Sequence, residues 1–116
     1  MRIFETGKRG EDLAKGFFSS LGYRLLDANY RTKHGEIDLI FMDGRVLVFV
    51  EVKTRIKKSY RDIELLIDKR KTNRILKSAE IYINNSDIEF EEIRLDALFV
   101  ELKSGEPLFK HIKSFY

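Results

Sequence analysis

Residues 35–53, which read GEIDLIFMDGRVLVFVEVK, decide the fold of this 116-residue chain. Two mainly apolar runs, 37–42 and 46–53, flank an Asp-Gly pair at positions 43 and 44. An Asp-Gly pair between alternating apolar runs is the strongest short-range signal for a β-hairpin. The segment therefore predicts two antiparallel strands joined by a tight turn.

The acidic residues of this hairpin are predicted to share one face, because side chains alternate between the two faces of a strand. One face of the first strand then carries Glu36, Asp38, Ile40 and Met42, and the other carries Ile37, Leu39 and Phe41. A two-residue turn at Asp43-Gly44 would set Asp38 opposite Phe49. Glu51 then becomes its diagonal neighbour, about 7–8 Å away at the backbone. Lys53 lies on the same face as Glu51.

Two carboxylates among apolar side chains are costly, because buried like charges repel each other and lose hydration. A divalent cation removes this cost, and carboxylate oxygens suit Mg²⁺ or Mn²⁺. The chain has no cysteine and two histidines, which argues against a zinc site. The alternative is an exposed cross-strand pair of Glu51 and Lys53 with Asp38, which the spacing alone does not exclude.

A helix is predicted over residues 7–21. Apolar residues recur there at helical spacing, at Ala14, Phe17, Phe18 and Leu21. Gly22 stands where helices commonly end. Glu11 falls on or beside the apolar stripe, near Gly7 and Gly10, which permit close backbone approach. Its carboxylate can therefore join the acids of the hairpin; the alternative is an ordinary acid in the first turn of a helix.

The remaining pattern predicts one mixed α/β (α+β) domain over residues 1–116. Further strands are expected at 23–30, 93–100 and 107–112, and a second helix at 68–83 with Asp68 as its N-cap. The order is helix, three strands, helix and one or two strands. This order indicates a central mixed sheet with helices packed against it.

Charge is unevenly distributed, although the formal net charge is only +3. Residues 53–77 contain ten Lys or Arg against three Asp or Glu, whereas residues 80–101 contain seven acids against Arg94 alone. A basic segment suggests a polyanionic partner, although a charge run is more often a solvated helix face and loop. The opening residues show no apolar signal-peptide region and no stretch is long enough to span a bilayer, so we expect a soluble cytoplasmic protein.

Several motifs together resemble the YraN family of small bacterial proteins. They are Gly7-x-x-Gly10-Glu11-x-x-Ala14, Gly22-Tyr23, Asn29-Tyr30-Arg31, Gly35-Glu36-Ile37-Asp38-Leu39-Ile40 and Val48-Phe49-Val50-Glu51-Val52-Lys53-Thr54-Arg55. Looser matches follow at Lys71-x-x-Arg74-Ile75 with Ala79, at Arg94-Leu95-Asp96 and at His111-Ile112 with Phe115. The family resembles a branch of the PD-(D/E)xK nuclease superfamily, beside restriction endonucleases and archaeal Holliday-junction resolvases. The resemblance implies a restriction-endonuclease-like core, in which the superfamily's nominal Pro-Asp is Ile37-Asp38.

The resemblance also implies roles for the site residues. Asp38, Glu51 and the Val52 carbonyl would hold Mg²⁺ or Mn²⁺, and Glu11 would be a further ligand or hold coordinated water. Lys53 would orient or activate the attacking water and offset phosphate charge. Basic and aromatic residues are expected to bind the nucleic-acid backbone and bases; these are Arg55, Lys57, Lys58, Tyr60, Arg61 and Lys71.

The predicted function is metal-dependent hydrolysis of phosphodiester bonds in nucleic acid, with branched or single-stranded DNA as the expected substrate. One alternative is a nucleic-acid-binding module that keeps the fold without turnover, and another is a protein-interaction domain. Three carboxylates near a bound phosphate favour the nuclease over a pure binder of polyanions. The sequence leaves open the choice between DNA and RNA. It also leaves open the oligomeric state, including a homodimer.

Overall fold

The computed structural model of the protein describes residues 3–55, 69–102 and 105–114. Within these ranges the elements are α1 (Ile3–Ser20), β1 (Arg24–Thr32), β2 (Gly35–Asp43), β3 (Val46–Arg55), α3 (Lys69–Asn84), β4 (Glu92–Glu101) and β5 (Leu108–Ile112). The predicted order of helices and strands is confirmed, and the mixed α/β architecture is that of a restriction-endonuclease-like core. The expected N-cap, Asp68, lies outside the described residues.

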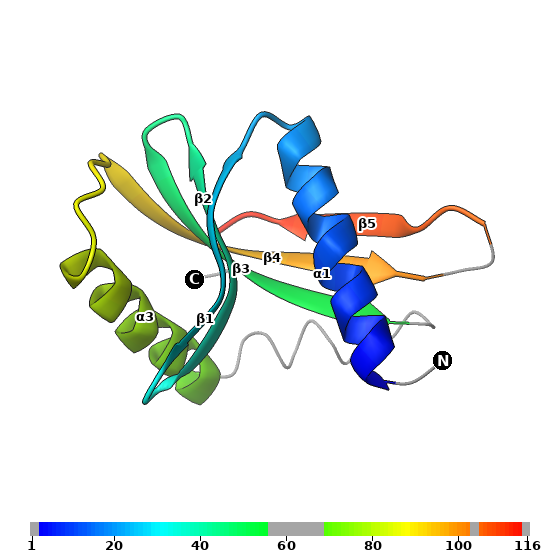
Figure 1. Ribbon diagram of the computed structural model, residues 1–116, viewed down its shortest axis with the longest axis horizontal. Helices are drawn as coiled ribbons and strands as arrows, with labels where there is room; N and C mark the ends of the chain where they lie inside the picture. The colour runs from blue at the N-terminus through cyan, green and yellow to red at the C-terminus, as the bar shows by residue number, and fades with distance from the viewer. Residues whose placement is uncertain (1–2, 56–68, 103–104, 115–116) are drawn as a thin grey trace.

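The strands of the described chain form one mixed sheet in the order β1-β2-β3-β4-β5 (Figure 1). The first three strands form an antiparallel meander, β4 pairs with β3 in parallel, and β5 returns antiparallel to β4. Because β3 and β4 are parallel, the chain between them must cross over the sheet, and α3 belongs to that connection. The meander and this crossover bring β2, β3 and both helices together around the middle of the sheet.

The two helices cover opposite faces of the sheet. Ala14 and Phe18 of α1 pack with one set of buried strand residues, namely Leu39, Phe41, Val48, Val50, Leu98 and Val100. Ile75, Ala79 and Tyr82 of α3 pack with the other set, namely Ile37, Ile40, Met42, Leu47, Phe49 and Leu95. Both faces of β3 are therefore buried, which explains its nearly continuous apolar sequence.

The β2–β3 hairpin has a different register from the predicted one. Asp43 pairs with Val46, and Leu39 pairs with Val50, so the two loop residues are Gly44 and Arg45 rather than Asp43 and Gly44. Gly44 has φ 59°, as a glycine at the first loop position of a type II′ turn does. The register differs by two residues along the partner strand. Such an even shift keeps the paired residues of β2, from Leu39 onwards, on their predicted faces. Continued one residue further, this register sets Asp38 opposite Glu51 instead of Phe49.

Alternation along β2 fails at Asp38. Ile37, predicted to share a face with Leu39, packs instead in the core cluster under α3. On the neighbouring strand, the paired positions Ala28↔Leu39 and Tyr30↔Ile37 bracket Asn29, whose φ is 52°. Asn tolerates this left-handed conformation better than most residues. The strand pair is thus irregular at the place where Asn29 and Asp38 present polar side chains.

The C-terminal end of α1 is a Schellman motif with Gly22 in the left-handed conformation, which confirms the predicted helix end. Tyr23 N–H donates to Phe18 O at 3.0 Å and Gly22 N–H donates to Ser19 O at 3.0 Å. The Phe18 and Tyr23 rings lie 5.2 Å apart, which adds the apolar contact of this motif. Leu21 is 51% exposed because it follows the last helical residue, so its prediction as part of the apolar stripe was wrong. None of the described helices has an apolar stretch of the length needed to traverse a membrane.

Candidate active site

Close packing of α1 on β3 brings Glu11 to the sheet. Gly10 is buried against Thr54, and a Cβ atom added at Gly10 would overlap Thr54 Oγ1 and lie 2.8 Å from Thr54 Cβ. Glycine is therefore needed here for the backbone to approach. Gly7, in contrast, is exposed with nothing near it, so its predicted part in this approach was wrong. The contact at Gly10 sets the distance between α1 and β3, and with it the position of Glu11.

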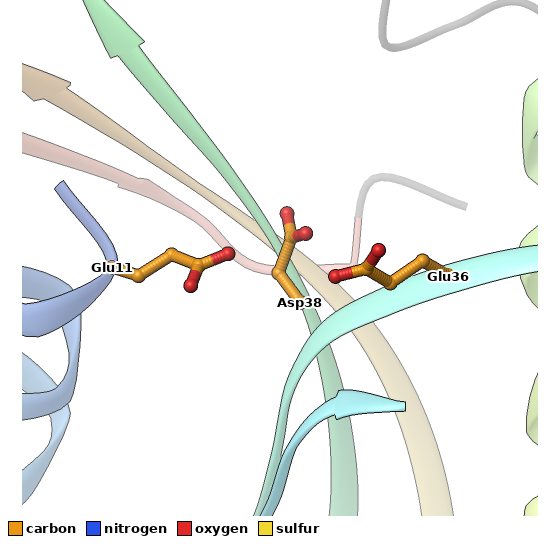
Figure 2. A group of neighbouring side chains, drawn as sticks. All are labelled: Glu11, Glu36 and Asp38. Carbon is orange, nitrogen blue, oxygen red and sulfur yellow. The ribbon is translucent and has the colours of Figure 1, made fainter. Parts of the chain in front are cut away.

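Three carboxylates from α1 and β2 converge beside the irregular position on β2 (Figure 2). Oxygens of Glu11, Glu36 and Asp38 lie within 4.8 Å of one another, and none of these side chains is fully exposed. Asn29 Nδ2 donates to Glu11 Oε1 at 2.9 Å and to Glu36 Oε1 at 2.8 Å. One amide group therefore holds two of the three acids in place. We call Glu11, Glu36 and Asp38 the acidic cluster.

Within the acidic cluster, Asp38 is the member that is held against β3. Its Oδ2 accepts a hydrogen bond from the Val52 N–H at 2.8 Å, which fixes the carboxylate against β3. Burial, assisted by the negative charges of Glu51, Glu11 and Glu36, raises the pKa of Asp38 to about 7, although the Val52 hydrogen bond acts in the opposite direction. Ionised Asp38 is therefore unfavourable in this site, because it is shielded from water and lies near other negative charges.

Two lysines meet on one oxygen of Glu51. Lys71 Nζ of α3 lies 3.0 Å from Glu51 Oε1, and Lys53 Nζ of β3 lies 3.5 Å from the same atom. The Glu51 and Lys53 side chains are only 11% and 21% exposed. Burial and the neighbouring Lys71 lower the pKa of Lys53, and the attraction of Glu51 and Asp38 opposes this effect only in part. The lysine side of the site thus carries two cations against one carboxylate, next to a cluster of three acids.

The structure brings together most of the residues predicted for the site. Glu11 and Asp38 meet in the acidic cluster, and Val52 reaches Asp38 through its N–H. Glu51 and Lys53 of β3 lie near enough to Asp38 of β2 to interact with it electrostatically. Lys71 of α3 pairs with Glu51. Arg55 ends β3 and donates to Thr54 O at 2.8 Å. The other predicted nucleic-acid-binding residues, Lys57, Lys58, Tyr60 and Arg61, lie outside the described residues.

Two members of the site were missed or underrated by reasoning from the sequence. Glu36 was placed on the face of Asp38 but was given little weight, and Asn29 was not proposed as a site residue at all. The signal for Asn29 was its place in the Asn29-Tyr30-Arg31 motif, whose polar ends both reach Glu36: Arg31 Nε lies 3.2 Å from Glu36 Oε2. This motif near the end of β1 was the available clue.

A second polar network lies between β4 and β5, away from the acidic cluster. Asp96 has a fully buried carboxylate, which accepts hydrogen bonds from Arg94 Nε at 2.8 Å and Arg94 Nη2 at 3.0 Å, and it pairs with His111 Nε2 at 2.7 Å. It also accepts from the Ser114 N–H at 3.1 Å, and Arg94 Nη2 donates to Tyr23 Oη at 2.7 Å. This network fastens β5 and the end of α1 to β4, which is a structural task.

Comparisons with known proteins identify the family of this chain. A sequence profile of the uncharacterised protein family UPF0102 matches residues 10–100. A UPF0102 protein of Dictyoglomus turgidum is 44% identical over 105 residues, which cover 90% of this chain and 89% of that protein. A UPF0102 protein of Dehalococcoides mccartyi is 36% identical over 95% of this chain and 91% of its own length. The resemblance to the YraN family is thereby confirmed, and the chain belongs to this family, UPF0102.

Proposed function

We propose that this protein is a metal-dependent nuclease that hydrolyses phosphodiester bonds of nucleic acid, with DNA as its substrate. One observation carries the proposal: the partly buried Asp38 of the acidic cluster lies near Glu51, and two lysines converge on Glu51. Acids that can hold a cation and ammonium groups that can hold a phosphate are the two parts that phosphodiester hydrolysis needs.

The acidic cluster fits Mg²⁺ or Mn²⁺ by its chemistry. All three groups offer carboxylate oxygen, and the oxygens lie within 4.8 Å of one another on three separate side chains. The raised pKa of Asp38, whose largest cause is burial, marks a carboxylate whose charge lacks compensation. Asp38, Glu11 and Glu36 would hold the ion, with Glu51 and the Val52 carbonyl as the further ligands that the resemblance implies. A divalent cation would supply Lewis-acid polarisation of the scissile phosphate.

Lys53 and Lys71 would supply the positive charge on the opposite side of that phosphate. Both ammonium groups lie within 3.5 Å of Glu51 Oε1, so a phosphate that reaches Glu51 also reaches both cations. Lys53 is the better group to orient the attacking water, because burial and Lys71 lower its pKa and so ease the loss of its proton. Asn29 would act as a positioning residue, since it holds Glu11 and Glu36 at their present separation.

The ion pairs of Glu51 favour a second candidate, a nucleic-acid-binding module without turnover. Glu51 Oε1 is already neutralised by two lysines, an arrangement that is complete without a cation. In such a module the lysines would bind phosphate, and the acidic cluster would have only a structural part. The two candidates differ in what the loss of Asp38 does, because a binder does not need that carboxylate.

The test is cleavage of labelled branched, single-stranded and duplex DNA, and of the matching RNA, with Mg²⁺, Mn²⁺ or EDTA. The variants are Asp38→Asn and Lys53→Ala, with Asp87→Asn and Lys113→Ala as controls at exposed positions of the same residue types. We expect cleavage that requires metal and is lost in both site variants but kept in both controls. Binding without cleavage on every substrate would instead support the binding module.

A further inference from the structure

The outer surface of α3 carries basic residues that continue from the lysine pair. Arg74 and Lys77 follow Lys71 at successive intervals of three, so they are neighbours on the helix surface. Both are exposed, whereas Thr72, Ile75 and Ala79 of the same helix are buried against the sheet. From Lys71 to Lys77 the helix rises about 9 Å. The cations thus form a row that starts at Glu51 and leads away from it.

The turn between β1 and β2 adds a fourth cation to this row. Thr32 Oγ1 and Ser78 Oγ lie 2.7 Å apart, which ties the turn to the middle of α3. The His34 N–H also donates to Thr32 Oγ1 at 3.0 Å, so the turn is held in one shape around this hydroxyl. Lys33, the exposed residue next to Thr32, therefore projects from a turn that is fixed against Ser78, the residue that follows Lys77 in α3. We call Lys33, Arg74 and Lys77 the basic track.

The positive charges of the basic track have no acidic partner in the described part of the chain. Among the described residues, Lys33, Arg74 and Lys77 make no ion pair, and Glu80 is the one acid that α3 contains. Some other surface cations are paired, namely Lys8 and Lys15 with Asp12, and Arg45 with Glu91. Unpaired cations gathered from two elements repel each other and weaken the fold slightly, so an external anion would be bound favourably.

The spacing of the basic track suits one strand of a nucleic acid. In a duplex each strand carries one phosphate per about 3.4 Å along the axis. The rise of about 9 Å from Lys71 to Lys77 therefore spans roughly three phosphates. Beyond α3 the chain turns acidic, with Asp87, Glu89, Glu91 and Glu92 before or at the start of β4. These acids would repel the backbone, so the row of cations has a defined end.

We propose that Lys33, Arg74 and Lys77 bind the phosphate backbone of the nucleic-acid strand that enters the site between Lys53 and Lys71. This inference rests on the proposed function for the identity of the ligand, but it concerns a surface that chemistry at Asp38 does not need. It assigns contacts with the nucleic-acid backbone to α3 and to the β1–β2 turn. It also gives the strand a direction, from Glu51 along α3 towards its C-terminal end.

The test compares two triple variants of equal charge change. The track variant is Lys33→Gln, Arg74→Gln and Lys77→Gln, and the matched control is Arg24→Gln, Lys110→Gln and Lys113→Gln, all exposed cations on β1, on β5 or just after β5. Binding of a fluorescein-labelled 20-mer, as duplex and as single strand, is measured by anisotropy over a salt series in EDTA. Thermal unfolding verifies that both triples fold.

We expect the track variant to lower the slope of log affinity against log salt by roughly 2 to 3 for duplex, since each lost phosphate contact contributes about 0.9. The control triple should retain the wild-type slope to within one contact. Equal losses in both triples would overturn the proposal, because net charge would then explain the binding. An unchanged track variant, or a wild type that binds neither probe, would overturn it as well.

This binding test, combined with the cleavage assay described above applied to the same variants, separates this proposal from the proposed function. Wild-type protein that binds through the basic track but never cleaves would remove the nuclease and keep the track. Wild-type protein that cleaves, with a track variant of unchanged salt slope and KM, would keep the nuclease and remove the track.

Discussion

The ammonium group of Lys71 on α3 lies 3.0 Å from a carboxylate oxygen of Glu51 on β3. The Glu51 side chain is 11% exposed and that of Lys71 is 32% exposed, so the pair is largely shielded from water. Lys53 lies 3.5 Å from the same oxygen. Because the two lysines share one carboxylate, their positive charge is only partly neutralised, and the remainder is available for a phosphate.

Replacement of Lys71 by Met should therefore reduce cleavage without unfolding the protein. The expected loss in kcat is roughly 10²-fold, the usual effect of removing one group that stabilises developing charge. Lys71→Arg should recover part of it, because the guanidinium keeps the charge but not the shape. Steady-state kinetics and a thermal melt would check this, with Lys69→Met as the exposed control on the same helix. Wild-type kcat in Lys71→Met would show that Lys71 takes no part in the reaction.

Asp38 should make the metal-free protein less stable as the pH rises. Its pKa is raised by burial, to about 7 in the folded protein from an ordinary value of 3.8. Between these two values the folded state binds more protons than the unfolded state, so the free energy of unfolding falls with increasing pH. The stabilisation is complete below pH 4 and is lost as the pH passes 7.

Melts in EDTA between pH 4 and pH 9 would measure this effect. Asp38→Asn should remove most of the decline and should be more stable than wild type above pH 7. Asp87→Asn, an exposed acid, should keep the wild-type profile. A wild-type stability that does not fall between pH 4 and pH 8 would contradict the raised pKa.

Mn²⁺ should bind at the acidic cluster and raise the melting temperature at pH 8. The cation compensates Glu11, Glu36 and Asp38 in the folded state alone, and at a hundred times its Kd it would add about 2.7 kcal/mol. Glu36→Gln and Glu11→Gln should each weaken Mn²⁺ binding in a calorimetric titration. Asp12→Asn, on the solvent side of α1, is the matched control and should bind as the wild type does. Equal affinity in all four proteins would place the metal elsewhere.

Gly10→Ala should be destabilising and should also lower activity. The new methyl group would meet Thr54, and forcing extra atoms into a packed contact typically costs about 1–3 kcal/mol. Gly16→Ala is the control, because that position in α1 is exposed with nothing near it. It should gain up to about 1 kcal/mol from the better helix propensity of Ala. Urea unfolding separates the two, and a neutral Gly10→Ala would refute the close approach of α1.

Asp96→Ala should damage the fold rather than the chemistry. The carboxylate is fully buried and bonded to Arg94 and His111, and removing one partner of such a buried network costs about 3–5 kcal/mol. The exposed Asp87→Ala should stay within about 0.5 kcal/mol of the wild type. Urea unfolding is again the measurement. A loss of cleavage in Asp96→Ala at full stability would mean that this network belongs to the site.

The elements of the fold could be predicted because their signals are local. The Asp43-Gly44 pair and the flanking apolar runs indicate a hairpin by themselves, and Gly22 marks the end of α1. The register was less secure, because it depends on which two residues occupy the loop. Gly44 takes the first loop position with φ 59°, and this choice moved Asp38 level with Glu51. The residues of β2 from Leu39 to Met42 kept their predicted faces, since a shift of two residues preserves alternation.

Most of the site could be predicted from periodicity, with Glu11 placed by the spacing of its helix and the other core members by the hairpin. Asp38, Glu51 and Lys53 follow from strand periodicity once the hairpin is accepted. The position of the Asn29 amide between Glu11 and Glu36 could not be predicted in this way. Asn29 has a left-handed backbone conformation, which breaks the periodicity of the strands. Ile37 changed core cluster at the same place.

The sequence by itself determined the helices and strands and the hairpin, because these depend on neighbours along the chain. Only the tertiary structure decided that Lys71 meets Glu51 and that Thr32 holds the β1–β2 turn against Ser78. Contacts between residues so far apart in sequence follow from how the layers pack, and α3 can be placed only once the apolar faces of β2 and β3 are buried beneath it.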